Sequence, residues 1–157
     1  MVLTRLVAWL VGVMALFWVV LVPIFERFAP PRVVRAYQRL TMPMFRPWAG
    51  IVPGWAVIET TGRKTGLPRR TPVAARIKED ACWVVAGIGR KTNYVRNIEA
   101  APRVRVRTHG RWYAGTAHLC PDDEARKRSL RLNPVNGLFL WLAGGDQLTV
   151  RIDLDPA

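Results

Sequence analysis

The chain has 157 residues, half of them hydrophobic, so it is long enough for one domain with a buried core and too apolar for an intrinsically disordered protein. Its 24 Lys and Arg residues outnumber 11 Asp and Glu residues, which gives a formal net charge of +13. Such a charge indicates a polyanionic partner: nucleic acid, acidic lipid headgroups or a polyanionic small molecule. Cys82, Cys120 and the two histidines are isolated in the sequence, so we expect neither disulfides nor a metal site.

The region near the amino terminus is long and uncharged. Leu6–Phe25 carries no charge, and its 20 residues would span the ~30 Å hydrocarbon core of a bilayer as a helix. A cleaved signal peptide is the alternative, but its apolar region is usually about 7–15 residues long. We therefore expect residues 1–28 to form a single-pass anchor in the cell membrane. Arginines dominate the charges that follow, against Glu26 alone: Arg27, Arg32, Arg35, Arg39 and Arg46. The positive-inside rule then predicts a cytoplasmic C-terminal domain.

Residues 29–54 are predicted to connect the anchor to the domain. Apolar residues and arginines alternate at helical spacing over residues 32–41, which predicts a short basic amphipathic helix. Such a helix lies either on the membrane surface or against the domain. Three prolines between Met42 and Gly54 predict an irregular connection there.

The remaining residues, 55–157, are rich in strand signals. Short runs of Val, Ile, Thr and aromatic residues are separated by turn residues and predict strands at Ala56–Thr61, Arg70–Lys78, Ala81–Ile88, Arg103–Thr108, Arg111–Leu119 and Gln147–Leu154. Helices are expected at Asn93–Ala100 and Asp122–Leu132. Six strands with few helices predict a mainly β fold with some α structure, either a small antiparallel barrel or an α+β sandwich.

The segment Thr60–Pro72 is the most informative part of the sequence. It lies between two predicted strands and combines two glycines with four cations and threonine hydroxyls. Backbone N–H groups, hydroxyls and arginine forks are the groups that bind a phosphate or a carboxylate. The segment is no P-loop, because the GxxxxGK[ST] pattern is absent. A solvated basic turn is the alternative interpretation.

This segment also resembles the signature of the deazaflavin-dependent nitroreductase family, which includes quinone reductases. The resemblance covers roughly Val57 to Ala117, and further similar stretches are Val84–Gly87, Asn93–Ile98, Ala101–Val106 and Gly110–Arg111. It implies a split β-barrel fold of the FMN-binding type, with coenzyme F-420 as hydride donor and FMN as the less favoured cofactor. Because coenzyme F-420 carries a phosphate and an oligoglutamate tail, the basic segment matches it in charge.

The resemblance also implies roles for individual residues. Those expected to hold the phosphate and the tail are Arg63, Lys64, Thr65, Gly66 and Arg69. Those expected to line the deazaflavin ring are Thr71, Pro72, Ala86, Gly87, Ile88, Gly89, Arg90 and Lys91. Asn97, on a predicted helix, is expected either to brace the backbone or to contact the cofactor.

The implied reaction is hydride transfer from reduced F-420 to a lipophilic acceptor: a quinone, an unsaturated lipid or a nitro compound. Two departures from the family pattern bear on it. Tyr94 replaces a tryptophan that relatives often have, and Leu138–Leu142 lacks the tyrosines of nitroreductase-type members, so the sequence assigns no proton donor. A non-catalytic, membrane-anchored protein that binds F-420 or a fatty acyl chain is the alternative. A nucleic-acid-binding module is not expected, and a homodimer is a further expectation.

Two surface patterns remain open. Arg103, Arg105 and Arg107 share one face of a strand, which is either solvated or in contact with anionic lipid headgroups or the glutamate tail. The apolar run Leu138–Leu142 belongs either to the core or, beside an anchor, to a surface that reaches lipid.

Overall fold

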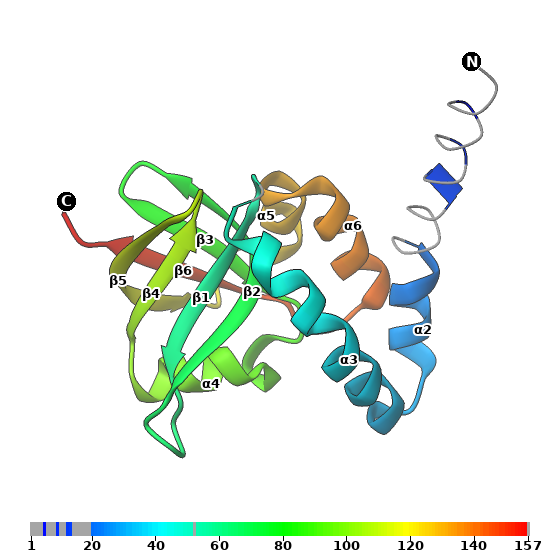
Figure 1. Cartoon of the computed structure of the whole chain (residues 1–157), viewed down its shortest axis with the longest axis horizontal. Helices are drawn as coiled ribbons and strands as arrows, with labels where there is room; N and C mark the ends of the chain where they lie inside the picture. Colours follow the sequence, from blue (N-terminus) through cyan, green and yellow to red (C-terminus); the bar gives the residue numbers. More distant parts are fainter. Residues whose placement is uncertain (1–4, 6–8, 10–11, 14–19, 52, 157) are drawn as a thin grey trace.

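The computed structural model describes residues 5, 9, 12–13, 20–51 and 53–156. Six strands close into an antiparallel barrel in the order β1-β2-β3-β6-β5-β4 (Figure 1). Of the two folds that the sequence predicts, the barrel is confirmed and the sandwich is wrong. The strands are β1 (Trp55–Thr61), β2 (Pro68–Lys78), β3 (Ala81–Ala86), β4 (Arg103–Thr108), β5 (Arg111–Cys120) and β6 (Leu148–Leu154).

Alternating side chains and tight turns explain the barrel. Along β4, for example, Val104 and Val106 are buried inside the barrel, whereas Arg103 and Arg105 point to solvent. The β4–β5 turn uses His109 and Gly110 with φ of 48° and 79°, the left-handed pair that a two-residue hairpin requires. Local patterns of this kind fix the strand register.

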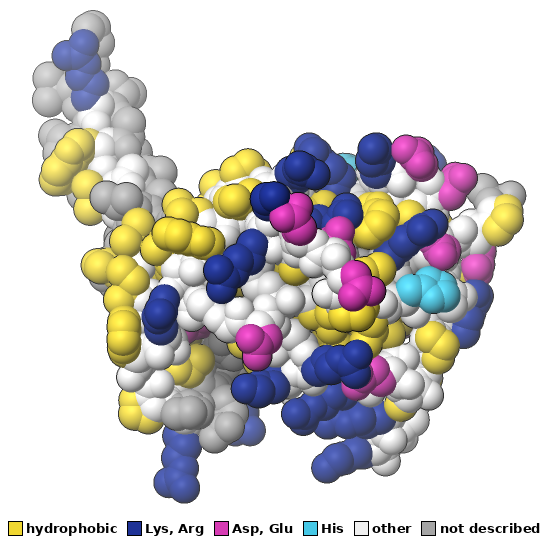
Figure 2. All heavy atoms as spheres, turned by 180° about the vertical axis from the view of Figure 1, so that it is seen from behind, with side chains coloured by type: hydrophobic (Ala, Val, Ile, Leu, Met, Phe, Trp, Pro, Cys, Tyr) yellow, Lys and Arg dark blue, Asp and Glu magenta, His cyan; other side chains and the backbone are white. Residues whose placement is uncertain are grey.

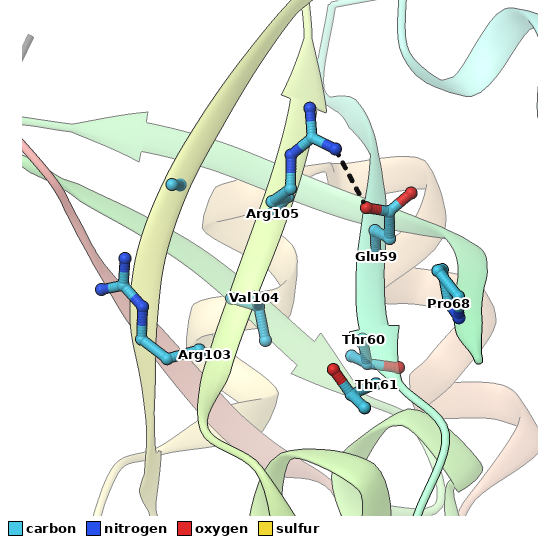
Figure 3. A pocket seen from close by; sticks show the side chains of 8 residues that line it. Glu59, Thr60, Thr61, Pro68, Arg103, Val104 and Arg105 are labelled. Carbon is cyan, nitrogen blue, oxygen red and sulfur yellow. Dashed lines mark hydrogen bonds and ion pairs between the residues drawn. The ribbon is translucent and has the colours of Figure 1, made fainter. Parts of the chain in front are cut away.

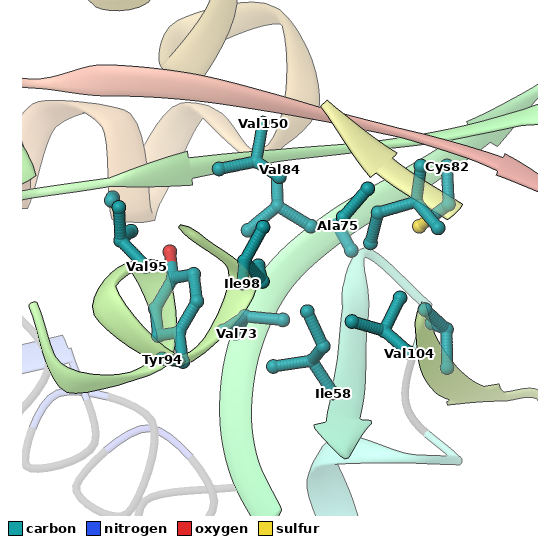
Figure 4. Close-up of a cluster of buried hydrophobic side chains, with 14 of the residues drawn as sticks. Ile58, Val73, Ala75, Cys82, Val84, Tyr94, Val95, Ile98, Val104 and Val150 are labelled. Carbon is teal, nitrogen blue, oxygen red and sulfur yellow. The ribbon is translucent and has the colours of Figure 1, made fainter. Parts of the chain in front are cut away.

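The core fills the barrel and extends to one helix. Ile58, Val84, Val150 and other apolar side chains from all six strands are buried there. Helix α4 (Asn93–Ala100) packs against this core through Tyr94, Val95 and Ile98 (Figure 4). One face of α4 is therefore held against the barrel, and the positions of its polar residues are fixed.

Helix α3 (Pro31–Ala49) corrects the predicted linker. The expected irregular connection from Met42 is helical as far as Ala49, and only the residues after it form a connection. A proline inside a helix removes one backbone hydrogen bond and crowds the preceding turn, a cost of about 3 kcal/mol that other contacts must offset. Contacts of α3 with β1 and β2, and the buried Ala49 at its end, stabilise the longer helix.

Two helical elements next to the barrel are not predicted from the sequence. The 3₁₀ helix η2 (Gly89–Lys91) leads into α4, and helix α6 (Pro134–Ala143) follows the expected helix α5 (Ala125–Leu132). The Asn133 side chain accepts a hydrogen bond from the Asn136 amide at 3.1 Å and so caps α6, with Pro134 at its first turn. Helix α6 packs against α5 and against α2 (Val22–Phe28).

Most of the predicted anchor, Leu6–Phe25, lies outside the described residues. Within the part of the chain that the structure describes, no helix is both long and apolar enough to cross a bilayer. The anchor and the cytoplasmic orientation of the domain stay predictions.

Candidate functional site

The loop between β1 and β2 is an ordered structure. The Gly62 amide donates to the Leu67 carbonyl at 2.9 Å, and the Gly66 amide donates to the Gly62 carbonyl at 2.7 Å. Gly66 has a φ of +66°, a conformation in which a glycine avoids the strain of a side chain. The Leu67 amide donates to the Thr65 hydroxyl at 3.4 Å. These bonds order the backbone of the loop, from which the cationic side chains extend.

Asn97 of α4 fixes the base of this loop. Its amide nitrogen donates to the Thr60 hydroxyl at 3.0 Å, and both residues are almost fully buried. Its oxygen accepts from the Arg63 amide at 3.2 Å and from the Arg63 guanidinium at 3.1 Å. These bonds brace the backbone of the loop, one of the two roles expected for Asn97, and its contact with the cofactor stays a prediction.

Between the loop and α4 lies an open cavity of about 880 Å³. Its lining residues are Gly62, Arg63, Lys64, Thr65, Pro68, Arg69, Arg70, Thr71, Asn93, Tyr94 and Asn97. Four of these lining residues are cations. Of the four, only Arg70 forms an ion pair with another described residue, Glu59, at 2.7 Å. Uncompensated cations, hydroxyls and amides are the donor set that a phosphate or a polycarboxylate requires.

The cavity brings together part of the predicted site. Six of the predicted residues line it: Arg63, Lys64, Thr65, Arg69, Thr71 and Asn97. Gly66 belongs to the same loop, and Pro72 follows Thr71 on β2, paired with Val57. The roles that the resemblance implies for these residues stay predictions.

The predicted ring-lining segment Ala86–Lys91 does not line this cavity. The segment lies beside α6. Gly87 is so close to the Leu140 side chain of that helix that an added Cβ atom would collide with it. Gly89 has a φ of +54°, and a Cβ atom there would collide with the Asp146 carbonyl oxygen. The segment then continues through η2 into α4 and so reaches the edge of the cavity.

Several residues that line the cavity are not among the predicted site residues. Asn93 stands four positions before Asn97, so both lie on the same side of α4, a helical spacing that was available in the sequence. Tyr94 is buried, and its burial raises the pKa of the phenol, which keeps it neutral. Arg70 lies opposite Glu59 in the strand register, a pairing that the sequence does not reveal by itself.

A second, smaller cavity of about 300 Å³ lies on the outer face of β1 and β4 (Figure 3). Here Glu59 accepts from the Arg105 guanidinium at 3.2 Å, and Arg103 forms a bidentate pair with Asp155. Trp112 packs against the Arg105 guanidinium, which lies 4.8 Å from its ring centre. Because carboxylates compensate these arginines, this face is a poorer anion site than the β1–β2 loop, and its contacts favour the solvated alternative.

The closed antiparallel barrel of six strands is a split-barrel fold. Solved structures show the same fold. A F420-H2 dependent reductase, FDR-A, is similar over 65% of this chain and 96% of its own, with 18% identity and a TM-score of 0.52. General Stress Protein 26 from Bacillus anthracis is similar over 76% of this chain and 90% of its own, with 16% identity and a TM-score of 0.50. At these identities the likeness shows the fold alone.

The sequence itself identifies the family. The profile of the family described as F420H(2)-dependent quinone reductase matches residues 31–152, and the chain belongs to this family. The predicted resemblance and the predicted cofactor, coenzyme F-420, are thereby confirmed at the level of the family. Comparison with curated proteins gave no match.

Proposed function

We propose that this protein binds reduced coenzyme F-420 in the cavity between the β1–β2 loop and α4 and passes its hydride to a lipophilic acceptor. Membership of the F420H(2)-dependent quinone reductase family supports a quinone-type acceptor. The observation that carries the proposal is the loop itself, in which Arg63, Lys64 and Arg69 have no carboxylate partner among the described residues.

The cofactor supplies the hydride when it is bound, and the protein supplies binding and orientation. Lys64 and Arg69 would attract the phosphate and the glutamate tail as exposed cations. Thr65, Thr71 and Asn93 would donate neutral hydrogen bonds at the same cavity. Since Asn97 ties the Arg63 backbone to the barrel, the donors of the loop are arranged before the ligand arrives, which lowers the entropic cost of binding.

The proposal includes a location at the membrane. The uncharged run Leu6–Phe25 supports an anchor, and the arginines that follow it support a cytoplasmic domain. An anchored enzyme meets a membrane-soluble acceptor at a raised effective concentration. A homodimer stays a prediction, which sedimentation of the detergent-solubilised chain tests.

A non-catalytic F-420 or fatty-acyl carrier is the second candidate. The residues that line the cavity favour this carrier. Among them, only Tyr94 has a neutral side chain that is a weak acid, its phenol, and burial raises the pKa of that phenol. A weak, buried acid is a poor proton source for reducing a quinone.

Charge reversal tests the binding site. Lys64→Glu and Arg69→Glu should each weaken F-420 binding by more than tenfold, because a charge-assisted contact contributes about 1.5–3 kcal/mol. The matched controls are Lys127→Glu and Arg126→Glu on α5, both exposed and remote from the cavity. Affinities are read by fluorescence titration of the deazaflavin. Equal, small effects in both pairs would mean that the loop is a solvated turn.

Turnover separates the enzyme from the carrier. Reduced F-420 should be reoxidised faster when a menaquinone analogue is added, and this acceptor should outperform a small nitroaromatic. Tight binding of F-420 without reoxidation by any lipophilic acceptor would support the carrier instead. Absence of F-420 binding would refute the enzyme and the F-420 carrier, and would leave only the fatty-acyl carrier.

A further inference from the structure

Helix α6 presents an apolar face that the proposed cofactor site does not use. Val135, Leu138 and Trp141 recur every three residues and lie on one side of the helix, with exposed fractions of 60%, 40% and 56%. No residue from Pro134 to Gly145 carries a charge. Because a helix that faces water normally carries charged or polar residues on its outer side, this face is suited to an apolar phase.

Helix α2 lies beside α6 and extends this face. The two helices are in contact, and a Cβ atom on Gly144, just after α6, would lie 3.7 Å from the Arg27 guanidinium. The Phe25 ring also meets the Tyr37 ring of α3 edge-on, with 6.3 Å between centroids. The exposed apolar residues of α2 are Ile24, Phe25 and Phe28, the last with 78% of its surface exposed. We call the surface formed by Ile24, Phe25, Phe28, Val135, Leu138 and Trp141 the α2–α6 face.

Cations lie near the α2–α6 face. Arg27 belongs to α2 itself, and Arg32 follows Phe28 by four residues at the start of α3; both are exposed. Figure 2 shows hydrophobic side chains gathered at the end of the molecule next to α2, with Lys and Arg side chains nearby. An apolar surface with neighbouring arginines is complementary to the acyl chains and the anionic headgroups of a bilayer.

We propose that the α2–α6 face lies in the boundary between headgroups and acyl chains of an anionic membrane, so that α6 forms a second membrane contact far from the amino terminus in sequence. This inference rests on the proposed membrane location. The uncharged sequence Leu6–Leu21 leads directly into α2, so a bilayer that takes up this sequence places α2 at its surface. Since α6 packs against α2, its outer side meets the same surface. Interfacial helices insert their apolar side by about 5–10 Å into the bilayer. Tryptophan is enriched at that depth, which is where Trp141 of α6 would lie.

The experiment measures the depth of single labelled residues in the full-length protein. The Cys120→Ser substitution removes the accessible native cysteine, and the buried Cys82 stays unlabelled. Single cysteines that carry an environment-sensitive fluorophore are then introduced at Leu138, Val135 or Phe28. The control position is Arg126 on α5. Each protein is reconstituted into phosphatidylcholine vesicles with or without phosphatidylglycerol. A nitroxide lipid labelled near the headgroup end of its acyl chain then quenches fluorophores that lie at the boundary.

We expect strong quenching and a blue-shifted emission at positions 138, 135 and 28, enhanced by phosphatidylglycerol, and neither change at 126. Quenching at 28 without quenching at 138 and 135 would overturn the proposal while leaving the anchor intact. A blue shift at 138 that needs high protein concentration rather than vesicles would overturn it in favour of a second copy on this face. Titration of the same proteins with F-420 reports the proposed function separately, because the cavity includes no residue of α2 or α6.

Discussion

Replacing Asn97 by alanine tests whether this residue holds the cofactor loop in place. The Asn97 amide donates a hydrogen bond to the Thr60 hydroxyl at 3.0 Å, and the substitution removes this donor. Thr60 is only 2% exposed, so water has little access to its hydroxyl. A buried polar group left without a partner costs about 1–3 kcal/mol. The two bonds from Arg63, one from its backbone amide and one from its guanidinium, contribute less, because Arg63 is exposed and water replaces Asn97 as their acceptor.

The expected loss of stability is therefore about 2 kcal/mol, which corresponds to roughly 4–8 °C in the unfolding midpoint of a chain of this size. Tryptophan fluorescence of the detergent-solubilised protein reports the midpoint. Asn93→Ala is the control, since it removes an exposed asparagine from the same helix. The Asn97→Ala variant should also bind F-420 more weakly, because the loop then becomes ordered only on binding.

A double-mutant cycle locates the cost. Thr60→Val removes the hydroxyl while keeping the shape of the side chain, so in the Asn97→Ala background it should be nearly neutral or stabilising. In the otherwise unchanged protein the same substitution should destabilise the fold, because it leaves the buried Asn97 amide without an acceptor. Additive losses in the cycle, or an unchanged midpoint for Asn97→Ala, would refute the bracing role.

Two further predictions concern other parts of the barrel. The Arg128 guanidinium donates to the Asp123 carboxylate and holds its pKa below the usual value, with the Thr149 hydroxyl donating as well. A carboxylate with a lowered folded pKa stabilises the protein above its unfolded pKa of about 4, and this contribution disappears as the pH falls through the folded pKa. Asp123→Asn should thus lower the unfolding midpoint at pH 7, whereas in acid the midpoints of the variant and the unsubstituted protein should become equal. A difference in midpoint that does not change with pH would contradict the ion pair. Burial raises the pKa of the Cys82 thiol to about 12, so a thiol reagent should modify the partly exposed Cys120 alone until the protein unfolds, and early labelling of both would contradict the packed core.

Local patterns account for what the sequence predicts well. The strands follow from alternating residues and tight turns, as with Val104, Val106 and the His109–Gly110 turn, and both signals lie within a few residues. The ends of the predicted strands shift by a few residues because flanking bends depend on neighbouring elements; β3, for instance, ends at Ala86 rather than Ile88. The family motif in turn pointed to the loop that forms the cavity.

Features that depend on distant contacts escaped prediction. Helix α6 is apolar on several sides, so its sequence has no clear helical periodicity, and its place is set by Leu140 and by packing of Gly137 against the α5 backbone. The bond between Asn97 and Arg63 joins residues 34 positions apart, and only the closed barrel brings them together. The resemblance implies a ring-lining role for the segment Ala86–Lys91, but the neighbours of this segment depend on distant contacts, and the structure places Gly87 against α6.

This position of Gly87 connects the two proposals. The chain from Gly87 to Thr92 begins beside Leu140 of α6, passes through η2 and ends at the first turn of α4, whose Asn93 lines the cationic cavity. If α6 lies in the membrane boundary and the glutamate tail lies on the β1–β2 loop, this segment runs from the neighbourhood of the first surface to the edge of the second. An acceptor that stays dissolved in the bilayer would approach the reaction from the side of α6, whereas the polyanionic donor would enter from water. Such a division would explain why this small protein carries a strongly basic loop on its barrel and an uncharged helix beside it: each surface would match the phase from which its ligand comes.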